Sequence, residues 1–216
     1  AIPGVVSVGS TFGAPLGSTS ATGTAHVEGR PEAPPGEEVR AQMRPVTPGY
    51  LETMGISVLK GRGIQDSDRT GSVEVALINE TLARGLFPGE DPLGKRVRVT
   101  VSFGFGFPYR TIVGVVADTR NVALTRDPEG AFYVPQRQAG PGYMTVAVLS
   151  RPGMDGLAED IRGEVATLDP NLPLRDVETM NQLVSEEMAP TRFVLILLAV
   201  FAGLALALAA VGLYGV

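Results

Sequence analysis

The chain closes with 24 residues that carry no charge, and this run constrains the fold more than any other feature. Residues 193–216 read FVLILLAVFAGLALALAAVGLYGV. An α-helix rises about 1.5 Å per residue, so the run would be roughly 36 Å long and would exceed the roughly 30 Å hydrocarbon layer of a bilayer. The alternative is a helix buried in a soluble core, which the length and the lack of charge disfavour. The run therefore predicts a transmembrane helix.

Small residues recur at every fourth position of this run. Ala199, Gly203 and Ala207 place a small-xxx-small stripe on one side of the predicted helix. Small side chains let helix backbones approach closely. The stripe therefore favours packing against other membrane spans over isolation in lipid.

An amphipathic helix is predicted immediately before the run. Thr179 and Gln182 have the spacing of a capping box, in which each side chain satisfies a backbone N–H group of the other residue. Apolar residues then follow along one face, at Met180, Leu183, Val184 and Met188. We expect Pro190 to separate this helix from the membrane run, because proline lacks the N–H that a helix interior uses.

The rest of the chain alternates short strand patterns with helix patterns. Strands are expected near residues 5–8, 39–43, 56–59, 73–78, 95–101, 111–117, 131–134, 144–149 and 174–177, and helices at 50–54, 79–87 and 155–168. Asn79 is expected to cap its helix, and the helix at 155–168 is expected to face the core. The first 50 residues are otherwise expected to be rich in loops. This pattern predicts an α+β fold with mixed or antiparallel sheets.

Composition disfavours several classes of function. The chain has 18 Lys and Arg against 23 Asp and Glu, so its net charge of −5 gives no basic field for nucleic acid. It has no cysteine, which removes disulfides, thiolate nucleophiles and Cys-rich zinc sites. His26 is the one histidine and is expected in a solvated loop without a nucleophile motif, which disfavours a hydrolase triad. Adjacent acids are expected to be solvated surface groups, namely Asp66/Asp68, Glu90/Asp91 and Glu159/Asp160.

Residues 89–96, GEDPLGKR, fit the G-x-x-x-x-G-K frame of a phosphate-binding loop. However, Arg96 occupies the position of the magnesium-binding Ser or Thr, and a strand pattern follows where a phosphate-binding loop opens a helix. We therefore expect a turn fixed by Pro92 and Gly94, without nucleotide binding.

Aromatic residues alternate around two glycines at residues 103–109. The set comprises Phe103, Phe105, Phe107 and Tyr109. The favoured interpretation is a hairpin whose aromatic side chains alternate into the core. The alternative is an exposed contact for a lipid or a partner protein.

Six motifs, in this order, resemble the MacB-type and FtsX-type permeases of ABC transporters, especially the duplicated orphan permeases of acidobacteria. They are VTPGYLETMGISVLKGR (46–62), VALINETLARGLFPGEDPLGKRVRV (75–99), YRTIVGVVADTR (109–120), AFYVPQRQ (131–138), LDPNLPLRDVETMNQLV (168–184) and FAGLALALAAVGLYGV (201–216). Each motif is weak alone, and the ordered set is specific.

The resemblance implies a two-lobed periplasmic core domain at residues 1–189 and the start of a transmembrane helix at 190–216, which would make the sequence a fragment. It implies a non-enzymatic part of an inner-membrane transport or efflux system, with no cofactor. The expected partners are the inner membrane, other permease transmembrane helices, a separate or fused cytoplasmic ABC ATPase and a periplasmic protein. In this interpretation, the helix bearing Thr179, Gln182 and Pro190 couples the domain to the membrane.

A second hypothesis is a membrane-anchored periplasmic module that binds a lipid or a peptide without transport. The two hypotheses differ in whether further membrane spans belong to the same polypeptide. An anchored hydrolase is disfavoured because a nucleophile and a base would have to converge on the single histidine.

Overall fold

The computed structural model describes residues 2–13, 21–101, 107–119, 128–140, 144–154, 156–170, 174 and 176–214. In the last helix, the side chains of residues 186–196, 207 and 211–213 lie outside the described part. The chain divides into two compact units, Ala1–Pro173 and Leu174–Val216. The first unit contains the β-sheet, and the second contains the terminal helix.

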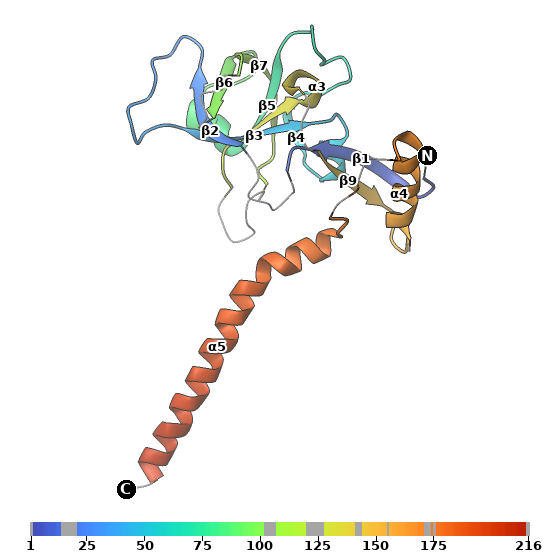
Figure 1. Ribbon diagram of the computed structural model, residues 1–216. Helices are drawn as coiled ribbons and strands as arrows, with labels where there is room; N and C mark the ends of the chain where they lie inside the picture. The colour runs from blue at the N-terminus through green and yellow to red at the C-terminus, as the bar shows by residue number, and fades with distance from the viewer. Residues whose placement is uncertain are drawn as a thin grey trace. The chain divides into compact units, whose positions relative to one another are not determined.

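The described strands form one mixed sheet (Figure 1). The strands are β1 (Val5–Thr11), β2 (Ala21–Val27), β3 (Arg40–Val46), β4 (Val58–Gly61), β5 (Val75–Asn79), β6 (Arg96–Val101), β7 (Arg110–Val116), β8 (Ala131–Pro135) and β9 (Thr145–Ser150). The helices are α1 (Tyr50–Thr53), α2 (Glu80–Leu86), α3 (Gln136–Ala139), α4 (Leu157–Leu168) and α5 (Met180–Tyr214).

Six of these strands close into a ring of pairings. They follow the order β2-β6-β7-β5-β8-β3, and β3 also pairs with β2. Most neighbours are antiparallel, whereas β5 runs parallel to β7 and β3 runs parallel to β8. Outside the ring, β1 pairs with β3, β9 pairs with β1, and β4 pairs with β7. Among the described strands, β4 and β9 therefore lie at the edges of the sheet.

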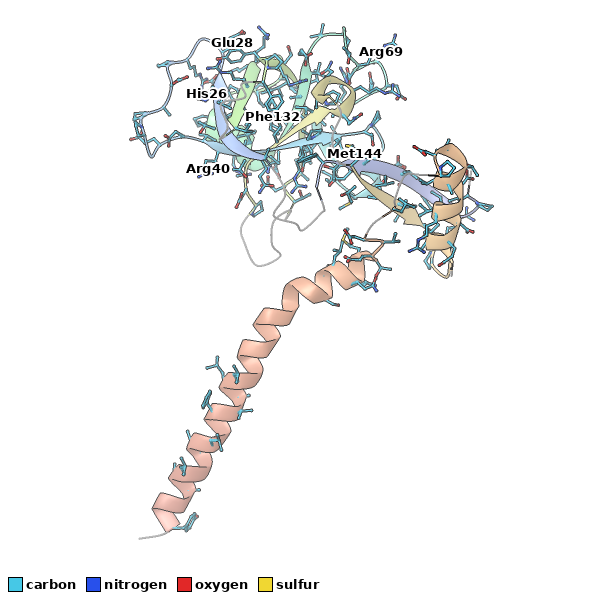
Figure 2. The ribbon with its side chains drawn as sticks, viewed as in Figure 1. His26, Glu28, Arg40, Arg69, Phe132 and Met144 are labelled. Carbon is cyan, nitrogen blue, oxygen red and sulfur yellow. The ribbon has the colours of Figure 1, made fainter. Side chains whose placement is uncertain are left out.

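Two apolar clusters cover opposite faces of the central strands. The larger cluster receives side chains from all six ring strands and from α2, and it includes Phe132 of β8 (Figure 2). The smaller cluster joins α1 to the other face, where Leu77 and Tyr133 lie. Because β5 and β8 are buried on both faces, their sequences are continuously apolar instead of alternating.

The predicted α+β class with a mixed sheet is confirmed. The strand expected at residues 73–78 is β5, and Asn79 caps α2 by accepting a hydrogen bond from the Leu82 backbone N–H at 3.1 Å. Leu82, Leu86 and Phe87 are buried as expected. The turn expected at residues 89–96 is also present, with Gly94 at φ 77°.

The loop expected around His26 is wrong. Residues 21–27 form β2, which pairs with β3 on one side and with β6 on the other. These backbone pairings outweigh the weak strand propensity of a segment rich in Gly, Ala and Thr. His26 is therefore a strand residue, with its side chain 16% exposed and its Nδ1 3.9 Å from Glu32 Oε1.

The core-facing helix expected at residues 155–168 is only partly correct. Helix α4 forms at Leu157–Leu168, but it has no buried residue, and Leu168 is 85% exposed. Leu157, Ile161 and Val165 are half-buried. The strand expected at residues 174–177 does not form at the described positions of that segment.

Helix α5 forms the second unit and runs unbroken from Met180 to Tyr214. The separation expected at Pro190 is therefore wrong: the helix continues through this residue and bends in its N-terminal part (Figure 1). A proline inside a helix removes one backbone hydrogen bond and bends the axis without necessarily ending the helix. Over the residues that the structure describes, no helix meets the length and apolarity needed to cross a membrane. The transmembrane helix at residues 193–216 thus stays a prediction from the sequence.

Candidate functional site

The N-terminus of α5 has the capping box that the sequence predicts. Gln182 Oε1 accepts hydrogen bonds from the Thr179 backbone N–H at 2.8 Å and from the Thr179 hydroxyl at 2.9 Å. In return, Thr179 Oγ1 accepts from the Gln182 backbone N–H at 3.3 Å. Both side chains are exposed, so within its own unit the first turn of α5 is fixed by these local bonds.

The later turns of α5 expose apolar side chains. Phe201 is 65% exposed. Four nearby leucines are exposed to a similar degree, namely Leu198, Leu204, Leu206 and Leu208. Ala199 and Gly203 are exposed, and apart from the adjacent residues and the backbone of the helix itself, no atom lies within 4 Å of the position that a Cβ on Gly203 would take. The side chain of Ala207 lies outside the described residues. A small and apolar surface of this kind lets another helix approach closely.

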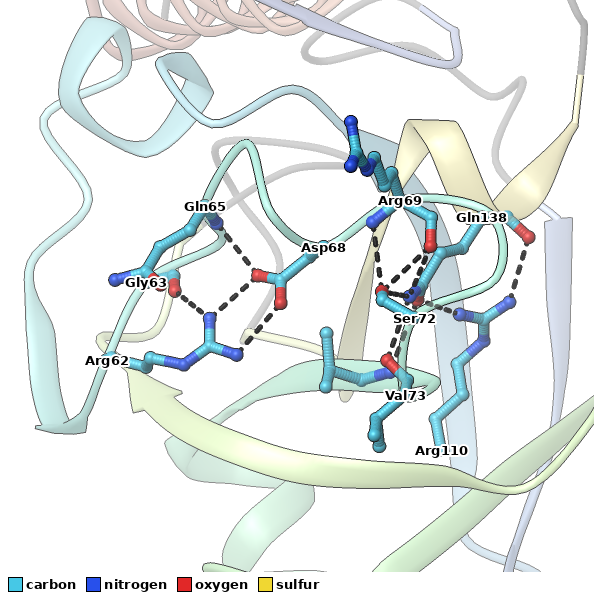
Figure 3. Close-up of polar contacts among 10 residues, drawn as sticks. Arg62, Gly63, Gln65, Asp68, Arg69, Ser72, Val73, Arg110 and Gln138 are labelled. Atoms are coloured by element: carbon cyan, nitrogen blue, oxygen red, sulfur yellow. Dashed lines mark hydrogen bonds and ion pairs between the residues drawn. The ribbon is translucent and has the colours of Figure 1, made fainter.

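A buried carboxylate anchors the loop between β4 and β5 (Figure 3). Asp68 accepts two hydrogen bonds from the Arg62 guanidinium, at 2.7 and 2.9 Å, and one from the Gln65 backbone N–H at 2.8 Å. Burial alone would raise the pKa of Asp68, but the bonds from Arg62 and Gln65 outweigh it and hold this pKa below the ordinary carboxyl value. Asp68 therefore stays ionised and keeps the loop in one conformation.

A second network in the same view joins this loop to α3 (Figure 3). Arg110 is 1% exposed and forms an ion pair with Glu74. Its guanidinium also donates to Gln138 Oε1 at 2.8 Å, while Gln138 Nε2 donates to Ser72 Oγ at 3.1 Å and to the Val73 carbonyl at 2.9 Å. Burial lowers the pKa of Arg110, and Glu74 partly offsets that effect.

A third network surrounds the start of α2. The Asn79 amide donates to Asp118 Oδ1 at 2.7 Å and to the Glu129 carbonyl at 2.8 Å. Its Oδ1 also accepts from the Ala131 backbone N–H at 2.8 Å. Asp118 in turn accepts from the Thr81 N–H at 2.9 Å. Asn79 is 1% exposed, so one side chain connects β5, α2 and β8 in the interior.

The expectation that the acidic pairs are solvated holds for five of the six acids, which are exposed, and is wrong for Asp68, whose side chain is 7% exposed and bound by Arg62. Asp66 lies 3.6 Å from Arg137, and Glu159 lies 3.2 Å from Arg162. Lys95, from the segment that fits a phosphate-loop frame, forms an ion pair with Glu90 and lies over the Phe87 ring at 4.8 Å. Among the described side chains, no group of three His, Cys, Asp or Glu residues could hold a metal ion.

The aromatic segment lies partly outside the described residues, which omit Phe103 and Phe105. Phe107 packs against the larger apolar cluster, and Tyr109 lies under the guanidinium of Arg98 at 5.0 Å. The flanking strands β6 and β7 are antiparallel, as a hairpin requires. For Phe107, the packing agrees with the favoured interpretation, in which the aromatic side chains turn into the core.

A family model described as the MacB-like periplasmic core domain matches residues 1–164 of the chain. No curated protein matches the chain. The match covers the whole sheet and most of α4, and it ends before α5.

Two solved structures with TM-scores of 0.50 or more share the fold, and a third is similar at a lower score. The periplasmic region of MacB from Actinobacillus actinomycetemcomitans has a TM-score of 0.53 and 17% identity, with 77% of this chain and 69% of that chain covered. A domain of a candidate permease protein from Porphyromonas gingivalis has a TM-score of 0.50 and 21% identity, with coverages of 84% and 70%. The extracellular domain of the noncanonic ABC-type transporter YknZ from Gram-positive bacteria has a TM-score of 0.48 and 19% identity, with coverages of 73% and 71%. At these identities the likeness concerns the fold.

Proposed function

The chain belongs to the family of MacB-like periplasmic core domains, and from this premise we propose that it is the extracytoplasmic domain of an ABC-type permease subunit. In this proposal, movements of the domain reach the membrane through α5. The observation that supports it most directly is the continuity of α5, which joins a capped polar start to an apolar end in one helix.

A continuous helix is suited to transmitting movement. The 35 residues of α5 correspond to about 50 Å of helix, which is longer than the hydrocarbon layer. The capping box fixes the first turn, and the bend in the N-terminal part gives the helix a point at which its direction changes. A pull or rotation at the first turn would then reach the apolar end as a rigid-body motion.

The apolar part of α5 is the proposed membrane segment. Its exposed leucines suit lipid, and Ala199 and Gly203 suit close contact with another span of the permease. We place the domain on the periplasmic side of the inner membrane, with the ATPase in the cytoplasm as a separate or fused partner. The domain itself is assigned no catalytic role, no cofactor and no nucleic acid.

The test is a coupling measurement in the whole permease with its ATPase. Replacing Thr179 and Gln182 with Ala frays the first turn of α5, because both members of the capping box are lost. We expect the variant to fold normally and to lose most of the coupling between the periplasmic domain and ATP hydrolysis. Asn181→Ala with Ser185→Ala is the matched control, since these exposed residues lie on the same turns. Full coupling in the Thr179/Gln182 variant would contradict the proposal.

A membrane-anchored binding module without transport is the second candidate. A surface cavity of about 300 Å³ in the first unit is the observation in its favour. The polypeptide would then carry no further membrane spans, and the capping variant would leave any ATPase unaffected.

A further inference from the structure

A cavity of about 300 Å³ opens where two neighbouring parallel strands end. β3 and β8 run parallel, and their last paired residues are Val46 and Pro135. Beyond this pair the chain leaves the sheet at both strands and enters α1 and α3. Val8 of β1 and the loop that follows β4 line the remaining sides of the cavity. Crevices at the carboxyl ends of parallel strands are frequent ligand sites, because the chains diverge there.

Part of the lining of this cavity is apolar. Val8 is 50% exposed and Ile64 is 7% exposed, whereas Val46 is fully buried and offers no accessible surface. Pro48 and Pro135 add two rings whose backbone torsions are restricted. Beside them, the Asp68 carboxylate is held by the Arg62 guanidinium, so the wall is fixed without a ligand. Such a preformed lining suits one apolar group of moderate size.

The rim carries one anion and one cation. Asp66 and Arg137 both line the cavity, and their side chains are 83% and 59% exposed. Their charged atoms are 3.6 Å apart, which is too long for a hydrogen bond and gives a weak surface pair. Both groups can therefore form new bonds at little cost. The carboxylate can accept a hydrogen bond from an N–H group, and the guanidinium can donate one to a carbonyl.

We propose that this cavity binds an extended peptide segment of a periplasmic protein partner, with one large apolar side chain inserted. In an extended peptide, the residue that carries this side chain presents its own N–H and C=O on one side, and Asp66 and Arg137 complement these two groups. The volume is at the lower end for ligand sites, so it suits a single side chain and not a long acyl chain. Two carboxylates in the lining, Asp66 and Asp68, disfavour a phosphate group. The inference rests on the proposed function only for the partner's location in the periplasm.

The experiment uses the full chain in nanodiscs with ¹³C-labelled isoleucine methyl groups. The Ile64 methyl group lies in the cavity lining, whereas Ile78 is buried in the other apolar cluster and serves as the internal reference. N-acetyl-leucine N-methylamide is the probe. N-acetyl-glycine N-methylamide has the same backbone without the apolar side chain, and decanoate has an acyl chain without the backbone.

We expect the leucine probe to shift the Ile64 signal with an affinity in the millimolar range and to leave Ile78 unchanged. Asp66→Asn and Arg137→Gln should each weaken binding about threefold to tenfold, since each removes one charge-assisted hydrogen bond. Asp160→Asn and Arg162→Gln are the matched controls on α4 and should bind as the parent does. Pro48→Trp should fill the cavity and abolish the shift of the Ile64 signal. If the Ile78 signal shows that this variant misfolds, Gln136→Trp is the alternative cavity-filling variant.

Equal shifts with the glycine and leucine probes would overturn the proposal, because the apolar lining would then contribute nothing. A larger shift with decanoate would identify a lipid site instead, and no Ile64 shift at about 20 mM probe would rule out this site. These measurements involve no ATPase. If the Thr179/Gln182 variant loses coupling but the probe does not bind the chain, the cavity proposal alone fails. If the probe binds but that variant keeps full coupling, the permease proposal alone fails.

Discussion

Replacing Asp68 with Asn tests whether the buried ion pair holds the loop between β4 and β5 in place. The substitution keeps the size of the side chain and removes its charge. Asp68 is 7% exposed at its side chain and accepts three hydrogen bonds, two of them from Arg62. An amide has a single acceptor oxygen, so it cannot keep the bidentate contact and the bond from Gln65 together.

The size of the effect follows from the exposure of the two partners. Breaking a fully buried pair costs about 3–5 kcal/mol, whereas an exposed pair is worth about 0.2–1 kcal/mol. Arg62 is 36% exposed at its side chain and can recover water when Asp68 loses its charge. We therefore expect Asp68→Asn to lower the free energy of unfolding by about 2 kcal/mol, which corresponds to about 4–8 °C in the melting temperature.

Tyrosine fluorescence is a suitable signal for this unfolding, because the chain has no Trp and both Tyr50 and Tyr133 are fully buried. Asp66→Asn is the matched control two residues away, and its exposed pair should change stability by less than about 0.5 kcal/mol. The pKa of Asp68 is lowered in the folded state, so its stabilisation is present above about pH 3.9 and is lost as the pH falls through the folded value. The difference in the free energy of unfolding between the parent and Asp68→Asn should thus become smaller below pH 4. A loss under 0.5 kcal/mol at pH 7 would refute this reasoning.

Four further substitutions test the other contacts by urea unfolding. Glu74→Gln should lower the free energy of unfolding more than Arg110→Met does. Glu74→Gln leaves the Arg110 guanidinium charged at 1% exposure, whereas Arg110→Met leaves Glu74, which is 35% exposed and can be solvated. The reverse order would contradict a buried guanidinium that depends on its partner. Asn79→Ala should cost about 3 kcal/mol, since it removes the cap of α2 and leaves buried backbone groups unpaired, and a cost below 1 kcal/mol would show that other groups replace it. Gly9→Ala should cost about 2 kcal/mol, because the new Cβ would lie 2.2 Å from the Tyr50 Cα; an unchanged midpoint would mean that β1 and α1 separate freely.

The sequence was most informative where local signals agreed with each other. The apolar run of β5, followed by Asn79 as a cap and by Leu82 and Leu86 at helical spacing, predicts a strand and a helix that the structure confirms. The capping box of Thr179 and Gln182 also forms as its spacing predicts. In each case the contacts that determine the element join residues close together in the chain, so the local sequence is enough to predict them.

The sequence was least informative where distant segments decide the structure. β2 has a weak strand pattern, and it forms because β3 and β6 pair with its two edges. Gln138 meets Arg110 from 28 residues away, and Asn79 meets the Glu129 carbonyl from 50 residues away. The cavity beside Arg137 likewise combines four separate segments. The one signal in the sequence for these networks is the position of polar residues directly beside apolar strand segments, which does not identify their partners.

Cysteine labelling of the whole permease polypeptide in cells tests most directly that the domain is periplasmic and that α5 enters the membrane. Residues 1–216 contain no cysteine, so each single substitution is the one labelling site in this segment once any cysteine elsewhere in the polypeptide is replaced by serine. A membrane-impermeant maleimide should label Glu32→Cys from the periplasmic side and should leave Leu204→Cys unlabelled until the membrane is dissolved. Protection of Glu32→Cys in cells with an intact inner membrane, or equal labelling of Leu204→Cys, would contradict the placement of the chain.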